Sequence, residues 1–139
     1  MGRDALTKRN AERRKAEKVL RIGIASRAEM RARTLAIARG TLKPAPSDPK
    51  VWFSSLESLA QVLSSKNQLL LETIRKARPG SLKELAELSG RAEGNLSRTL
   101  RTMARYGLVR LDKADGRRIV PEVPWDRVAL DMALERNAA

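Results

Sequence analysis

The spacing of apolar residues predicts a strand and then a helix in the first part of the chain. Residues 19–25 alternate between apolar and other side chains, which is the period of a short strand. The residues after it, from Ser26 to Glu29, have the pattern of a capping box, and they predict a helix that Gly40 ends. The apolar face of the strand carries Leu20, Ile22 and Ile24.

Beyond residue 50 the apolar spacing becomes helical. Apolar positions recur at intervals of three and four over residues 56–77, a second capping box opens a short helix at Ser81, and a third helix is expected over residues 94–106. Two short strands, 108–111 and 117–120, flank a polar turn that contains glycine. The expected fold class is therefore α+β, mainly helical, with the hairpin as a small β wing.

The third helix has two chemically different faces. Its inner stripe contains Leu96, Leu100 and Met103. A row of arginines on the other side is often only a solvated surface, but the hairpin that follows adds more cations, and the order helix, helix, helix, hairpin is the outline of a winged helix-turn-helix. The polar side of the helix carries Asn95, Arg98, Arg101, Thr102 and Arg105. The cations of the wing are Lys113, Arg117 and Arg118.

Charge narrows the choice of partner. Lys and Arg total 29 against 16 Asp and Glu, a net charge of +13 in a chain of 139 residues. Such an excess of one sign favours a polyanion, and nucleic acid is the first candidate. No stretch approaches the roughly 18 consecutive apolar residues of a membrane helix, so we expect a cytoplasmic, nucleoid-associated protein without membrane contact.

The chain contains neither cysteine nor histidine. Disulfides, thiolate or imidazole metal sites, and mechanisms with a histidine base or a cysteine nucleophile are thereby excluded. Glu84 and Glu87 lie about one helical turn apart, but a magnesium site needs more converging carboxylates than this pair. We expect no enzymatic activity, no cofactor and no metal.

Charge and proline content divide the chain into segments. Residues 1–40 hold 12 Lys and Arg against four acids, and the run from Thr7 to Lys18 has no apolar side chain larger than alanine. Three prolines fall between residues 41 and 50. The expected segments are a basic flexible arm (1–18), a strand–helix interaction segment (19–40), a proline-rich linker (41–50), a winged helix-turn-helix domain (51–123) and a C-terminal helix (124–139).

A helix beside a basic hairpin suits duplex DNA, because a major groove about 12 Å wide admits one helix and phosphates flank it. The N-terminal end of a recognition helix points at base edges, so the expected base contacts are Asn95, Ser97 and Arg98. Ser81 has a competing role as the N-cap of its helix. The expected phosphate contacts are Ser81, Lys83, Arg91, Arg101, Thr102 and Arg105, with Lys113, Arg117 and Arg118 in the wing.

Three stretches of the chain carry a family resemblance. They read SLKELAELSG from Ser81, NLSRTL from Asn95 and RYGLV from Arg105. Over about residues 52–123 the chain resembles the winged-helix core of MarR- and ArsR-like transcriptional regulators of bacteria and archaea. The resemblance implies dimeric binding to an operator palindrome. The chain lacks the cysteine and histidine pairs with which many ArsR relatives sense metals.

A longer pattern resembles a subgroup of these regulators that is often encoded beside small toxin genes and is regarded as antitoxins. For this subgroup the resemblance implies that the protein binds and neutralises a toxin. The pattern consists of Arg21-Ile-Gly-Ile, Ala38-Arg-Gly40, Trp52-Phe-Ser-Ser55 and Arg91.

The two ends of the chain offer candidate interaction surfaces. A lone strand must join a sheet, so Leu20, Ile22 and Ile24 are candidates for binding a toxin partner, and pairing within the chain or with a dimer mate is the alternative. After Pro124 we expect a helix that packs against its copy to form a homodimer or else covers its own core.

The sequence thus favours a sequence-specific regulator that binds double-stranded DNA. Within this class it favours an autoregulating, antitoxin-type repressor that binds a toxin through its N-terminal segment. The alternative is a basic protein that binds the nucleoid or RNA without sequence preference. Affinity for one duplex over random duplex separates the two classes.

Overall fold

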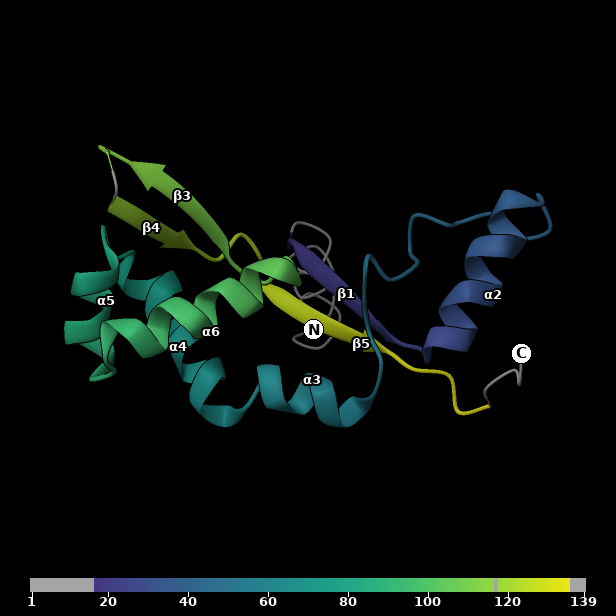
Figure 1. The fold of residues 1–139 in the computed structure, drawn as a ribbon, viewed down its shortest axis with the longest axis horizontal. Helices are drawn as coiled ribbons and strands as arrows, with labels where there is room; N and C mark the ends of the chain where they lie inside the picture. The colour runs from purple at the N-terminus through teal and green to yellow at the C-terminus, as the bar shows by residue number, and fades with distance from the viewer. Residues whose placement is uncertain (1–16, 117, 136–139) are drawn as a thin grey trace, which may run out of the picture.

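The computed structural model describes residues 17–116 and 118–135, which form five helices and two small sheets, an α+β architecture. Figure 1 shows the larger sheet in the middle of the molecule, with helices and the hairpin at one end and a single helix at the other. The helices are α2 (Arg27–Ala38), α3 (Leu56–Val62), α4 (Ser65–Ala77), α5 (Leu82–Ser89) and α6 (Glu93–Arg105). The strands are β1 (Val19–Ile24), β2 (Val51–Phe53), β3 (Arg110–Ala114), β4 (Arg118–Glu122) and β5 (Arg127–Asp131).

β1 is the central strand of a parallel three-stranded sheet with the order β2-β1-β5. Ile24 is in register with Phe53 of β2, and Leu20 is in register with Val128 of β5. The segment from α3 to β4 is therefore inserted between two strands of one sheet. The Lys18 amide donates to Asp126 Oδ2 at 2.8 Å, which joins residues 108 positions apart at the start of the β1–β5 pair.

β3 and β4 form a separate antiparallel hairpin, as the sequence predicts. The turn lies between the paired residues Ala114 and Arg118, and Asp115 and Gly116 within it have φ of 30° and 74°, in the left-handed region. β3 begins two residues later than the expected strand 108–111, because Leu108 and Val109 are buried in the core rather than paired in the hairpin. β4 continues two residues beyond the expected end at residue 120.

One hydrophobic core joins the parallel sheet to the helices. Leu20 and Ile22 of β1 are buried together with Leu85, Leu96, Leu100 and Met103 of the helices. The Phe53 ring of β2 stacks on Tyr106 after α6, with ring centroids 4.0 Å apart. Residues 41–50, the expected linker, connect α2 to β2, and the strands on both sides of this segment belong to the core that the helices share.

The structure gives no support to the expectation that the first strand binds a toxin partner. Leu20, Ile22 and Ile24 are 2%, 0% and 7% exposed, and β1 has a hydrogen-bonded neighbour on each side. The alternative, pairing within the chain, is what the structure shows. A buried central strand has no free edge to offer a partner.

The C-terminal helix expected over 124–139 is replaced by a strand. Residues 127–131 form β5, which pairs with β1 along its length. Val128, Leu130 and Met132 recur at every second position, which is the period of a strand, and β1 would otherwise lack one neighbour. Residues 136–139 of the expected helix lie outside the described part of the chain.

α2 has the start that its capping box predicts. The Ser26 hydroxyl accepts from the Glu29 amide, and a Glu29 carboxylate oxygen accepts from the Ser26 amide, both at 3.1 Å. None of its side chains is buried, and Figure 1 shows this helix apart from the others. An ion pair between Arg33 and Asp48 at 3.1 Å ties it to the loop before β2.

The basic arm expected at 1–18 falls mainly on residues 1–16, which lie outside the described part of the chain. In the part described, no helix has the length and apolar character needed to cross a membrane.

Candidate nucleic-acid interface

The rotation of α6 about its axis is fixed by its buried stripe. Leu96, Leu100 and Met103 are at most 1% exposed and lie in the common core. The opposite face is therefore held toward solvent, in the direction that the sequence predicts. On that face Asn95, Arg98, Arg101 and Arg105 are exposed, and Thr102 beside them is half-buried, as is Ser97.

The arginines of this face differ in how they are held. The guanidinium groups of Arg98 and Arg101 form no hydrogen bond or ion pair with any described residue. Arg105 donates from Nη2 to the Thr102 hydroxyl at 3.3 Å, and this hydroxyl donates to the Arg98 carbonyl at 3.1 Å. Arg98 and Arg101 can therefore reach an external anion without losing an internal partner, whereas Arg105 exchanges one weak hydrogen bond.

No side chain caps the N-terminus of α6. Ala92 occupies the N-cap position, and no side chain accepts a hydrogen bond there. The amides of a helix's first turn have no partner within the helix, so uncapped ones are available to acceptors from outside. Asn95 lies in this turn, which gives the end of α6 both side-chain and main-chain donors.

Ser81 is the N-cap of α5, the competing role expected from the sequence. Its hydroxyl accepts from the Glu84 amide at 3.1 Å. The second half of the predicted capping box is displaced by one residue, because Glu84 Oε2 accepts from the Gly80 amide at 2.8 Å. Lys83 is exposed on the first turn of α5, beside this cap.

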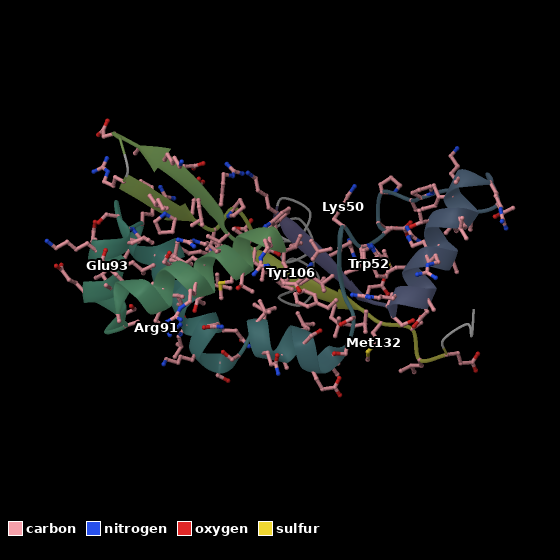
Figure 2. The ribbon with its side chains drawn as sticks, in the orientation of Figure 1. Lys50, Trp52, Arg91, Glu93, Tyr106 and Met132 are labelled. Carbon is pink, nitrogen blue, oxygen red and sulfur yellow. The ribbon has the colours of Figure 1, made fainter. Side chains whose placement is uncertain are left out.

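Arg91, an expected phosphate contact, is used within the fold. It lies in the turn between α5 and α6, and its guanidinium donates to Asn67 Oδ1 at 3.0 Å and to the Lys66 carbonyl at 2.8 Å. Both partners belong to the first turn of α4, so Arg91 ties the α5–α6 turn to that helix (Figure 2). The sequence shows the arginine but not these partners, because Asn67 is 24 positions away.

The wing is less cationic than the sequence analysis supposed. Arg118 pairs with Asp115 at 3.3 Å, and Arg110 pairs with Glu122 at 3.8 Å. Lys113 is exposed and has no partner among residues 17–116 and 118–135, while Arg117 lies outside the described residues. The acids that offset the wing are visible in the sequence, so this correction could have been made there. The arginines on the outer face of α6 are therefore less offset by neighbouring acids than the cations of the wing.

Two carboxyl groups have displaced pKa values, and neither lies on this face. A hydrogen bond from the Ala45 amide, followed by one from Arg33, lowers the pKa of Asp48. The hydrogen bond from Lys76 lowers the pKa of Glu72. Paired surface acids of this kind support the structure rather than acid–base chemistry. The described residues contain no group of three or more carboxylates that could hold a metal ion.

One cavity was not foreseen from the sequence. It has a volume of about 760 Å³ and lies between α4 and the segment that leads into β5. Its polar groups are already paired: Arg75 with Asp126 at 2.8 Å, and Lys76 with Glu72 at 2.6 Å. Apolar walls with paired polar groups give little basis for choosing a ligand. The apolar walls include Leu63, Leu71, Trp125 and Val128.

The chain was compared with protein families, curated proteins and solved structures. A protein-family model designated HVO_A0114 matches residues 62–130, from the last residue of α3 into β5. Neither a curated protein nor a solved structure matches the chain. The chain is therefore similar to the HVO_A0114 family over the segment that contains α4 to α6, the hairpin and most of β5.

Proposed function

We propose that this protein is a sequence-specific regulator of transcription that binds double-stranded DNA through α6. The observation that carries the proposal is the outer face of α6, where Arg98 and Arg101 are exposed and their guanidinium groups form no hydrogen bond or ion pair with any described residue. A helix that binds in a DNA groove needs cations that are not already paired within the protein, and it needs a fixed orientation. The buried face of α6 supplies that orientation.

The elements around α6 support a winged helix-turn-helix arrangement. α5 ends at Gly90, whose φ of 72° allows the chain to turn sharply, and three residues later α6 begins. The antiparallel hairpin β3–β4 follows α6 directly in the sequence. In Figure 1 the hairpin projects beside α6, where a wing would reach the neighbouring groove or backbone.

In this proposal each side chain has a separate role. Asn95 and Arg98, near the start of α6, reach base edges, because asparagine suits adenine and arginine suits guanine. Arg101 and Arg105 contact phosphates on either side of the groove. Lys113 is the wing cation that is free to contact the backbone. Arg91 is left out of the interface, because its guanidinium already bonds to α4.

The antitoxin-type role remains a prediction from the sequence alone. Binding of a toxin through β1 does not fit a strand that is buried between two others. The proposed function is accordingly regulation through DNA, with repression of the protein's own gene as the form to test first.

The test compares two duplexes in a titration at about 150 mM salt, one from the region upstream of the chain's own gene and one of random sequence. We expect the upstream duplex to bind tighter by roughly 10³ or more, which is the range of specific recognition. Equal affinity for both duplexes at every salt concentration would overturn the proposal. A structured RNA of similar length serves as competitor, and preference for the RNA would support the RNA-binding alternative.

A further inference from the structure

β5 is an edge strand whose outer side no described residue covers. The sheet order is β2-β1-β5, so β1 uses only one edge of β5. Backbone donors and acceptors on an open edge are a template for pairing with another strand. Stable proteins usually protect edge strands by short length, charges, bulges or covering elements. β5 is five residues long, has no bulge in its pairing with β1, and carries its charges at its two ends.

The side chains along this edge are apolar on one face. Val128 and Leu130 are in register with the buried Leu20 and Ile22 of β1, so they continue the core face of the sheet. They are nevertheless 36% and 45% exposed, and Met132 just beyond the strand is 38% exposed. The core face thus extends to the edge of the sheet and is left partly open there.

The charges of β5 are arranged symmetrically about Ala129. Arg127 and Asp131 lie at the two ends of the strand, and both point to the face opposite Val128 and Leu130. A strand that reads cation, apolar, small, apolar, anion is complementary to itself when it is reversed. Among the described residues the Arg127 guanidinium pairs with Glu17 at 3.4 Å, and Asp131 forms no ion pair.

We propose that β5 pairs antiparallel with β5 of a second copy of this chain, around a two-fold axis through Ala129. Directly opposite residues of an antiparallel pair lie on the same face, so Arg127 of each copy lies opposite Asp131 of the other. Val128 lies opposite Leu130 in the same way. Two ion pairs and two apolar pairs result, and the two parallel sheets become one six-stranded sheet.

Other registers are less favourable for physical reasons. A two-fold axis perpendicular to the sheet permits only shifts by an even number of residues, because an odd shift would place opposite residues on different faces. A shift of two residues in either direction takes Arg127 away from Asp131. A shift of four toward the start of the strand places Arg127 opposite its own copy, which is a like-charge contact. Only the register centred on Ala129 pairs all five residues of β5.

This inference does not depend on the proposed function, because the mass of the particle is measured without DNA. If both are correct, the two α6 helices are related by the same two-fold axis, and the operator is a palindrome whose spacing that axis sets. A dimer without sequence preference would contradict the proposed function alone. A monomer that binds its upstream duplex tightly would contradict the inference alone.

The first test uses charge reversal in the full-length chain. Sedimentation equilibrium over a concentration series should give the mass of two chains for the wild type. Arg127→Asp and Asp131→Arg should each shift the protein toward monomer, because each places like charges opposite one another. The double variant, which carries both changes, should recover the dimer. Arg39→Glu, at an exposed position after α2, is the matched charge-reversal control and should leave the mass unchanged.

Recovery by the double variant separates a lost interface from a damaged fold, because both substitutions are still present in it. A wild type that is monomeric throughout the series overturns the inference. A dimer that neither single variant weakens overturns it as well, since the interface then lies elsewhere.

The second test uses the absence of natural cysteine. Ala129 lies opposite its own copy, at a separation that a disulfide spans. Under mild oxidation Ala129→Cys should therefore form a covalent dimer rapidly, and no other cysteine in the chain competes. Ala38→Cys, at the exposed end of α2, is the control and should cross-link slowly. Equal rates for the two variants would contradict the proposed register.

Discussion

The indole of Trp52 lies across the backbone of Gly23, its partner in the β1–β2 register. A Cβ at position 23 would lie far inside van der Waals contact with Cζ3 of the Trp52 ring. The guanidinium of Arg33 covers the ring at 5.2 Å from its centroid and also pairs with Asp48. Figure 2 shows Trp52 between the sheet and α2. None of the side chains of α2 is buried, so the helix has no core contact of its own. Its attachment to the sheet therefore depends on the contact between Arg33 and Trp52.

Replacing Gly23 by alanine should destabilise the protein by about 1–3 kcal/mol, the usual effect of forcing an extra carbon into a filled site. Urea unfolding followed by circular dichroism measures the change. Gly94→Ala is the matched control, because Gly94 lies in α6 with nothing within 4 Å of the added Cβ, and that substitution should stabilise the protein by about 0.5–1 kcal/mol. In a Trp52→Ala background the effect of Gly23→Ala should shrink, since the clash partner is gone. An unchanged effect there would place the strain elsewhere.

The ion pair of Asp48 should make the attachment of α2 dependent on pH. Hydrogen bonds from the Ala45 amide and from Arg33 lower the pKa of Asp48 in the folded chain. A carboxyl group whose pKa is lowered by folding stabilises the folded protein at pH values above its pKa in the unfolded chain. This stabilisation is lost as the pH falls through its pKa in the folded chain. The difference in melting temperature between wild type and Asp48→Asn should be constant near neutral pH and should diminish below about pH 4. A difference that stays constant down to strongly acidic pH would contradict this assignment.

Arg91→Met should lower the stability of the fold before it affects DNA binding. The substitution keeps the length of the side chain but removes the donors to Asn67 and to the Lys66 carbonyl, and an orphaned partner costs about 1–3 kcal/mol. Thermal unfolding measures the effect. Lys83→Met, on the exposed first turn of α5, removes the same charge and should leave the melting temperature almost unchanged. Equal stability of the two variants would show that Arg91 is no structural tie.

Two substitutions on α6 should differ in kind. Arg98→Ala should weaken binding to the preferred duplex by about 1–3 kcal/mol and relax base preference, while Arg105→Ala should weaken all duplexes alike and lower the salt slope by about one unit. Competitive titration with specific and random duplexes at several salt concentrations separates these effects. Arg98→Ala with unaltered preference would show that α6 is not the helix that reads bases.

Truncations should separate the basic arm from the sheet. Removing residues 1–40 deletes β1, the central strand, so we expect an unfolded or aggregated product. Removing residues 1–16 leaves every described element in place but deletes six Lys and Arg and two acids. This shorter deletion should keep the circular dichroism spectrum and reduce the affinity for all duplexes and its salt dependence. A folded product of the longer deletion would contradict the central role of β1.

The sequence predicts those helices and turns whose defining residues lie close together in the chain. The buried stripe of α6, the capping box of α2 and the Asp115-Gly116 hairpin turn each depend on neighbours close in the chain. The elements that local signals do not predict depend on contacts between distant residues. For β1 the sequence leaves open pairing within the chain or with a partner, because β5, the neighbouring strand, lies more than 100 residues further along.

The sequence does contain a signal for the strand β5, although a helix is expected there. Val128, Leu130, Met132 and Leu134 have the period of a strand, and the helix expected there depended on Pro124 as a start signal. Arg91 and the wing show a second limit of prediction from sequence. The sequence shows where the cations are, but whether a cation is available to bind DNA depends on acceptors such as Asn67 and Asp115, which folding brings next to it.

The insertion of the helices between two strands of one sheet also governs the order in which the chain folds as it leaves the ribosome. β1 emerges early, yet its second neighbour is synthesised more than 100 residues later. Until then one side of a strongly apolar strand stays open, and long-range pairing of this kind is slow. The nascent chain therefore relies on β2 and the growing helical layer to shield β1 during translation.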